Sequence, residues 1–175
     1  MSADIVTRMK QRVAVLCLSM MGLVGSLFAS EPAVTTVILI RHAEKVDASA
    51  NPGLSAAGQR RAQSLERLLR DVPIAAVYTT PFTRTRHTAQ PAAAGRGLSP
   101  TEITADTKLA ENTAARVLDH SGKAVLVVGH SNTIPDTIRA LGFKDVPAIE
   151  DTEYDRLFIC TLVDGKPVSM LTLRY

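Results

Sequence analysis

The sequence predicts an α/β fold, a three-layer α/β/α sandwich with a mostly parallel sheet and a C-terminal antiparallel hairpin. Two observations support this prediction. From Thr35 onward, short runs of β-branched and apolar residues alternate with stretches that have helical spacing. Near the end of the chain, two strand-like runs are separated by Asp164-Gly165, a dipeptide typical of hairpin turns. In such a fold, reactive groups belong at the carboxyl ends of the parallel strands.

The individual elements follow from local signals along the chain. The first strand-like run, 36–40, is β-branched and suits a strand that is buried on both faces. Ser55 is a plausible N-cap for the helix that follows. Pro81 fits the first position of the next helix, whereas Pro91 predicts that this helix is kinked or ends early. The expected strands are 36–40, 74–78, 102–105, 124–128, 157–163 and 168–173, and the expected helices are 56–70, 81–94, 108–120 and 132–141.

The composition excludes several classes of protein. The chain has 175 residues, of which 46% are hydrophobic and 21% charged. These values exclude a disordered polar tail, a collagen-like fibre and a disulfide-dense miniprotein. The length suits one compact domain with a sizeable core.

The N-terminus has the pattern of a secretory leader. Basic residues at positions 8, 10 and 12 precede an almost unbroken apolar run, Val13 to Phe28, and small residues follow it. This pattern predicts a signal peptide over residues 1–30, a domain over residues 31–175, and export, to the periplasm in the simplest case. The alternative is a retained membrane anchor formed by residues 13–28, although this run is shorter than the roughly 20 residues that span a bilayer comfortably.

Without residues 1–30, the chain is close to neutral. The whole chain has 20 Lys and Arg against 17 Asp and Glu, and three of the basic residues and one acidic residue lie in the leader. The remaining net charge of +1 does not indicate a nucleic-acid or anionic-membrane surface. Cys160 is then the only cysteine, so no intramolecular disulfide is expected. Its apolar neighbours predict a buried strand thiol.

Basic side chains follow three of the expected strands. Arg41-His42 comes directly after the first strand, and Gly129-His130 comes directly after the strand at 124–128. Arg84 falls in the first turn of the helix that follows the strand at 74–78, where backbone N–H groups already favour an anion. Four potentially cationic donors are therefore expected at one crevice. A dianionic phosphoryl group matches such a site.

At these residues, the sequence resembles the histidine phosphatase superfamily, also called phosphoglycerate-mutase-like. The resemblance covers nearly all of residues 35–140 and follows the order of motifs in the family. Its motifs are Arg41-His42, Leu54-Ser55-x-x-Gly58, Thr80-Pro81-x-x-Arg84-Thr85-x-x-Thr88-Ala89 and Gly129-His130. The closing stretch, Tyr154 to Phe158, is similar to small exported members of the family. No functional residue is assigned in that stretch.

The resemblance implies a reaction and a role for each site residue. His42 would be the nucleophile that takes the phosphoryl group, giving a phosphohistidine intermediate. Arg41, Arg84 and His130 would bind the phosphoryl oxygens. Fixed cations can stabilise phosphoryl transfer without a metal, so neither a metal nor a cofactor is expected. The implied activity is that of a hydrolase, a metal-independent phosphatase acting on a phosphorylated small molecule or saccharide.

The proton donor for the leaving group has three candidates. The position of Glu111 corresponds approximately to that of the carboxylate in the mutases, although a solvated helix glutamate is an equal explanation. Asp106, after the short expected strand, and Glu44 are the alternatives. The other histidines, His87 and His120, are assigned no chemistry, because neither follows a strand.

Two other functions remain open from the sequence. One is a protein phosphohistidine phosphatase with the same fold, whose substrates need the proton donor less. The other is a non-catalytic phosphate-binding domain, which loss of any of the four basic site residues would favour. All four are present.

Overall fold

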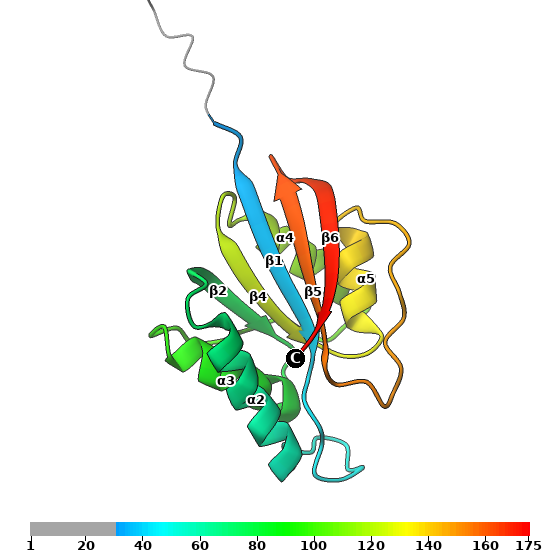
Figure 1. Cartoon of the computed structure of the whole chain (residues 1–175). Coiled ribbons are helices and arrows are strands. Elements are labelled where there is room, and N and C mark those ends of the chain that lie inside the picture. The colour runs from blue at the N-terminus through cyan, green and yellow to red at the C-terminus, as the bar shows by residue number, and fades with distance from the viewer. Residues whose placement is uncertain (1–30) are drawn as a thin grey trace, which may run out of the picture. The chain divides into compact units, whose positions relative to one another are not determined.

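A six-stranded mixed sheet forms the middle layer of residues 32–175 (Figure 1). The computed structural model describes residues 31–175. The predicted signal peptide or anchor lies outside the described residues. The strands are β1 (Val34–Arg41), β2 (Ile74–Thr79), β3 (Thr101–Glu102), β4 (Ala124–Gly129), β5 (Arg156–Val163) and β6 (Lys166–Arg174), in the spatial order β3-β2-β4-β1-β5-β6. The strands β3, β2, β4 and β1 pair in parallel, and β5 and β6 add antiparallel.

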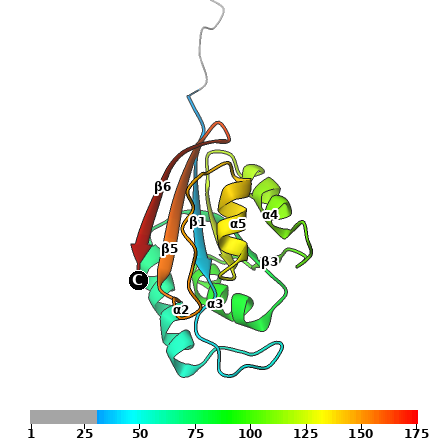
Figure 2. The same ribbon diagram turned by 90° about the vertical axis from the view of Figure 1, so that its right-hand side faces the viewer.

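Two pairs of helices cover the sheet on opposite faces (Figures 1 and 2). The helices are α2 (Ala56–Leu69), α3 (Thr83–Ala94), α4 (Leu109–Leu118) and α5 (Thr133–Ala140). Along β1, Ile38 and Ile40 pack in the core cluster under α2 and α3, whereas Val37 and Leu39 pack in the cluster under α4 and α5. Because successive side chains of a strand point to opposite faces, a strand covered on both sides has an unbroken apolar run. The predicted three-layer fold is confirmed.

The helix α2 begins as predicted and packs very close to the chain that leaves β1. The Ser55 side chain accepts a hydrogen bond from the Gly58 backbone N–H at 3.1 Å, which satisfies one of the free donors at the start of the helix. A Cβ atom at Gly58 would overlap the carbonyl oxygen of Glu44. Glycine at this position therefore lets the first turn of α2 pack directly against the backbone two residues after His42.

The start of α3 corrects one prediction. The helix begins at Thr83, so Pro81 lies in the preceding turn and not in the first helical turn. Phe82 occupies the N-cap position and offers no side-chain acceptor. The Thr83 N–H instead donates to the Asn51 side-chain oxygen at 2.8 Å, so a distant loop caps the helix. Of the two outcomes predicted for Pro91, a kink or an early end, the early end does not occur, and the helix ends at the expected residue. The helix continues to Ala94, because small residues near Pro91 are buried against the sheet.

At the two edges of the sheet, the bounds of β3 differ from the prediction and the C-terminal hairpin matches it. The predicted strand at 102–105 is wrong in its bounds, because β3 pairs with β2 only at residues 101 and 102. The C-terminal hairpin is confirmed, and Asp164 and Gly165 both have positive φ, at 50° and 74°. Cys160 is fully buried on β5, as predicted. Within residues 31–175, no helix has the length and apolar character needed to cross a bilayer.

Candidate active site

The two strand-end histidines lie side by side. His42 directly follows β1 and His130 directly follows β4, and these neighbouring parallel strands pair Arg41 with Gly129. The backbone N–H of His42 also donates to the Gly129 carbonyl at 2.9 Å. The two imidazole rings are consequently 5.3 Å apart between centroids, at an interplanar angle of 66°. Strand register alone therefore brings together two histidines that are 88 residues apart in the sequence.

His42 is buried and has one nitrogen available for chemistry. Its Nδ1 is 2.8 Å from the Ala43 carbonyl oxygen, which can only accept a hydrogen bond. Nδ1 therefore carries the proton, and the lone pair of the neutral ring is on Nε2. Burial, together with the positive charges of Arg41 and Arg84, lowers the pKa of His42 to about 4. The ring is accordingly neutral near pH 7.

His130 is held by a chain of hydroxyl groups. Its Nε2 is 2.9 Å from the Thr80 hydroxyl, and its Nδ1 is 3.5 Å from Nη2 of Arg84, which can only donate. The Nε2–H therefore donates to Thr80, the Thr80 hydroxyl donates to Thr85, and the Thr85 hydroxyl donates to a backbone carbonyl. Burial lowers the pKa of His130 to about 3, with His42 and Arg84 adding to the effect.

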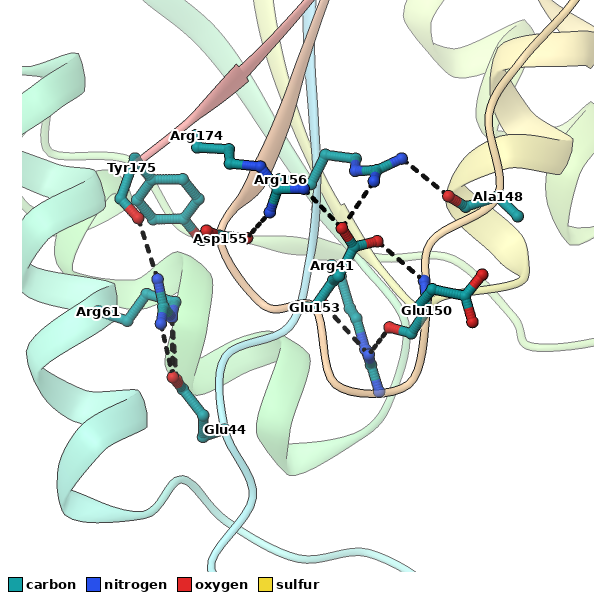
Figure 3. Close-up of polar contacts among 10 residues, drawn as sticks. All are labelled: Arg41, Glu44, Arg61, Ala148, Glu150, Glu153, Asp155, Arg156, Arg174 and Tyr175. Atoms are coloured by element: carbon teal, nitrogen blue, oxygen red, sulfur yellow. Dashed lines mark hydrogen bonds and ion pairs between the residues drawn. The ribbon is translucent and has the colours of Figure 1, made fainter.

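Arg41 is fixed by the loop that precedes β5. Its Nη1 donates to the carbonyl oxygens of Glu150 and Glu153, at 2.9 and 3.1 Å (Figure 3). Its guanidinium carbon lies 4.2 Å from the centroid of the Tyr154 ring, within cation–π range. Nη2 is 3.8 Å from the Asp151 carboxylate, which is itself 95% exposed. The guanidinium is therefore oriented before any ligand binds.

Arg84 approaches from the other side and has fewer contacts. It is the second residue of α3, and its guanidinium carbon lies 4.4 Å from the centroid of the Phe82 ring. Burial and the charge of Arg41 lower its pKa. Within the described residues, Nε of Arg84 and Nε of Arg41 are both buried without a hydrogen-bond partner. Two guanidinium groups with unused donors beside two imidazoles form a site for an oxyanion.

These four side chains line one open cavity of about 510 Å³. Lys45, Asp106 and Asp151 also line it. The three carboxylates considered for the proton donor are in different places. Asp106, in the loop between β3 and α4, lines the cavity, whereas Glu111 is exposed on α4 and does not. Glu44 accepts hydrogen bonds from Nε and Nη2 of Arg61, on α2 (Figure 3).

The remaining histidines lie elsewhere. His87 is exposed on α3, and His120 is 2.8 Å from the Tyr78 hydroxyl. In the part of the chain that the structure describes, no cluster of three or more His, Cys, Asp or Glu residues is arranged to hold a metal ion.

Sequence reasoning missed several residues around the site. Tyr154 and Asp151 were assigned no function, and the carbonyl groups that hold Arg41 have no side-chain signal at all. Thr80 was noted only as part of a motif. The aromatic residue at 154, just before a strand, is the one sequence feature that could have pointed to a contact with a cation.

Comparison with known proteins agrees with this geometry. The model of the family described as "Histidine phosphatase superfamily (branch 1)" matches residues 37–117, which include Arg41, His42 and Arg84. The match covers 81 of the 175 residues, so it shows a resemblance to this family over that part of the chain. No curated protein matches the sequence at a significant level.

Solved structures of several phosphatases share the fold. The protein histidine phosphatase SixA, complexed with tungstate, has a TM-score of 0.66 and 18% identity over 79% of this chain and 96% of its own. Phosphoserine phosphatase from Entamoeba histolytica has a TM-score of 0.60 and 17% identity over 81% of this chain and 97% of its own. A mycobacterial glucosyl-3-phosphoglycerate phosphatase has a TM-score of 0.63 and 12% identity over 81% of this chain and 98% of its own. At these identities, the likeness shows a common fold.

Proposed function

We propose that the protein is a metal-independent phosphatase that hydrolyses phosphomonoesters through a phosphohistidine intermediate on His42. The observation that carries the proposal is the hydrogen bonding of the His42 ring beside the two arginines. Its Nδ1–H is engaged by a carbonyl, and its Nε2 is free beside two guanidinium groups with unused donors. Such a site offers a nucleophile together with an oxyanion cradle.

The reaction follows from these contacts. The arginines bind the phosphoryl oxygens, and Arg41 does so without reorganising, because its other donors are already engaged. The Nε2 lone pair then forms a bond to phosphorus while the ester P–O bond breaks. The ring becomes positively charged, and the Ala43 carbonyl that accepts the Nδ1–H stabilises this charge. Water next attacks phosphorus, the P–N bond breaks, and the pair of electrons returns to Nε2.

His130 acts as a third oxyanion ligand in this scheme. Its pKa is low in the free site because it is buried among positive groups. A bound dianion offsets these charges, so the ring takes up a proton at Nδ1 and donates it in a hydrogen bond to a phosphoryl oxygen. The hydroxyl chain through Thr80 keeps Nδ1, and not Nε2, directed at the ligand.

Asp106 is the carboxylate that we assign as proton donor. It lines the cavity, whereas Glu111 is outside the lining and Glu44 is committed to Arg61. In the first step, Asp106 protonates the leaving oxygen. In the second step, it accepts the proton of the attacking water, which restores the starting state.

The test is hydrolysis of an aryl phosphate in the presence of EDTA, by the wild type and by His42→Ala. His87→Ala is the matched control, because His87 belongs to Arg86-His87, the second Arg-His pair of the sequence, and lies outside the cavity. We expect turnover in the wild type and the control, none in His42→Ala, and an acid-labile phosphoryl adduct on His42 after rapid quenching. Phosphate binding without turnover in the wild type would support a phosphate-binding domain. A requirement for a divalent metal would contradict the mechanism.

A second candidate substrate is phosphohistidine in proteins. The cavity is open, and an imidazole leaving group depends less on a proton donor. Asp106→Asn distinguishes the two candidates. It should reduce hydrolysis of an alkyl phosphate strongly and leave hydrolysis of a phosphohistidine peptide largely unchanged. A preference of the wild type for the peptide over sugar phosphates would favour this second candidate.

A further inference from the structure

The loop before β5 contacts Arg41 on several sides. Residues 150 and 153 supply the two carbonyl acceptors, and the ring of Tyr154 packs on the guanidinium group. Asp151, in the same loop, adds only a longer contact of 3.8 Å from an exposed carboxylate, so the direction of the guanidinium depends mainly on the two carbonyl groups and on the Tyr154 ring. Whatever fixes the shape of the loop therefore also fixes the direction of Arg41.

The Glu153 carboxylate fixes that shape (Figure 3). One of its oxygens accepts the Glu150 backbone N–H at 3.0 Å, while the Glu153 N–H donates to the Glu150 carbonyl at 2.9 Å, which closes the turn. The other oxygen accepts hydrogen bonds from Arg156 and from Arg174, each at 2.7 Å. Arg156 in turn donates to the Ala148 carbonyl at 2.8 Å. One carboxylate thus ties the turn to the first residue of β5 and to the end of β6.

The Glu153 carboxylate is ionised near neutral pH. The hydrogen bonds from Arg174, the Glu150 backbone and Arg156 lower the pKa of Glu153 to about 2. Glu153 does not line the cavity that holds Arg41 and His42. Its connection to the site runs only through the turn.

We propose that Glu153 is a positioning residue that aims Arg41 at the substrate phosphoryl group by clamping the 148–154 turn to β5 and β6. The inference rests on the proposed function, because it assumes that Arg41 binds an oxyanion. Glu153 itself touches no substrate. Its loss changes catalysis only by letting the two carbonyl acceptors, and with them the guanidinium, shift.

A pair of matched variants tests this role. Glu153→Gln keeps the shape of the side chain but places an amide NH2 against either the Glu150 N–H or the two arginines. Asp155→Asn is the control, because the Asp155 carboxylate also accepts from Arg174, at 2.7 Å, but forms no hydrogen bond with the 148–154 turn. Equilibrium binding of inorganic phosphate, kcat and KM for an aryl phosphate, and thermal unfolding are measured for each.

We expect Glu153→Gln to weaken phosphate binding and to lower kcat/KM by roughly 10- to 100-fold, as misplacement of a positioned group does. Asp155→Asn should stay within about twofold of the wild type. Glu153→Gln that binds phosphate as tightly as the wild type would overturn the inference. Equal losses in the two variants would also overturn it, because they would indicate a general effect of charge around Arg174.

A double-mutant cycle with Arg41→Ala separates positioning from general stability. Once Arg41 is absent, Glu153→Gln should cause no further loss of phosphate affinity, because Glu153 acts on the ligand only by positioning the Arg41 guanidinium. A full additional loss in the Arg41→Ala background would overturn the inference. If Glu153→Gln fails to fold, Arg174→Ala removes one clamp contact from a half-exposed side chain and enters the same cycle, with a smaller expected loss.

The cycle also distinguishes failure of the inference from failure of the proposed function. If Arg41→Ala weakens phosphate binding and Glu153→Gln does not, only the positioning role is wrong. If neither Arg41→Ala nor His42→Ala changes turnover, the proposed function itself is wrong.

Discussion

The two arginines of the site are held in different ways. Arg41, at the end of β1, is 6% exposed, donates to two backbone carbonyls and packs on Tyr154. Arg84, at the start of α3, packs on Phe82 and has one long contact to His130. One guanidinium is therefore fixed before a ligand arrives, and the other keeps freedom to adjust. The comparison divides the site into a rigid half, formed by Arg41, and an adaptable half, formed by Arg84 and His130.

The supports of the two halves also differ in their reach along the chain. Arg41 is separated from its carbonyl partners by 109 and 112 residues. On the other side, the hydroxyl chain from Thr80 to Thr85 spans five residues. The supports of Arg41 thus reach farthest along the chain, whereas those around Arg84 and His130 span between five and 50 residues.

Removal of each arginine in turn gives the largest expected effects. Arg41→Ala should lower kcat/KM by roughly 10³-fold, because a fixed donor stabilises the transition state without an ordering cost. Arg84→Ala should cost roughly 10²-fold, because part of its contribution is lost in ordering the side chain. Steady-state kinetics with an aryl phosphate measures both. Equal losses would contradict the division into rigid and adaptable halves.

Neighbouring threonines test the hydroxyl chain of the adaptable half. Thr80→Val leaves the His130 Nε2–H without an acceptor and should reduce kcat/KM about tenfold, together with a loss of about 1–3 kcal/mol in the free energy of unfolding. Thr79→Val is the control, because the buried Thr79 hydroxyl has no partner in the described residues. It should leave both quantities unchanged. If the two variants behave alike, the hydroxyl chain does not orient His130.

The cap on α3 should affect only the adaptable half. Asn51→Ala removes the acceptor for the Thr83 N–H and should lower the free energy of unfolding by about 1 kcal/mol. It should also raise KM modestly, because Arg84 lies in the first turn. Denaturant unfolding and kinetics measure these changes, with Asn112→Ala, at an exposed position of α4, as the control. An unchanged stability would mean that the helix start does not depend on this loop.

The smallest expected effect is on the pKa values of the two histidines. Arg41 depresses the pKa of His42 more than Arg84 does, whereas for His130 Arg84 has the larger effect. Removing a positive neighbour raises a histidine pKa, so Arg41→Ala should raise mainly that of His42, and Arg84→Ala mainly that of His130. Both pKa values should still stay below the usual range, because burial, the largest cause, remains. NMR titration of the ring protons measures them.

The same titration tests the protonation state of the free site. In the wild type, both rings should stay neutral down to about pH 5 and take up protons only near pH 4 for His42 and near pH 3 for His130. A midpoint for His42 near 6.5 would show that the ring is not shielded as the geometry indicates.

The sequence identified the four central side chains because their positions depend on local pattern and strand order. Arg41, His42 and His130 stand at the ends of apolar runs that were expected to be parallel strands, and the carboxyl ends of such strands share one edge of the sheet; the structure shows that these two strands are neighbours. The supports of Arg41 could not be found in this way. Carbonyl groups are the same in every residue, and which ones reach Arg41 depends on the path of an irregular turn after residue 141.

Loop geometry also explains why the sequence left the proton donor open and placed Pro81 wrongly. Glu111 and Asp106 are five residues apart, and only the observed start of α4 at Leu109 shows which of them lines the cavity. Similarly, Pro81 is compatible with a helix start, but the acceptor that caps α3 belongs to Asn51, far from it in the sequence.

The buried thiol of Cys160, on β5, provides a probe for transient opening of the sheet. Cys160 pairs with Val37 in the middle of the sheet, and burial raises its pKa to about 12. In the native state, alkylating reagents therefore cannot reach the side chain, and the thiol is not ionised to the reactive thiolate. Alkylation at this position, read by peptide mass, should therefore proceed only as fast as β5 separates from β1. Comparing the alkylation rate with and without bound phosphate would show how much a ligand at the strand ends slows the separation of β5 from β1.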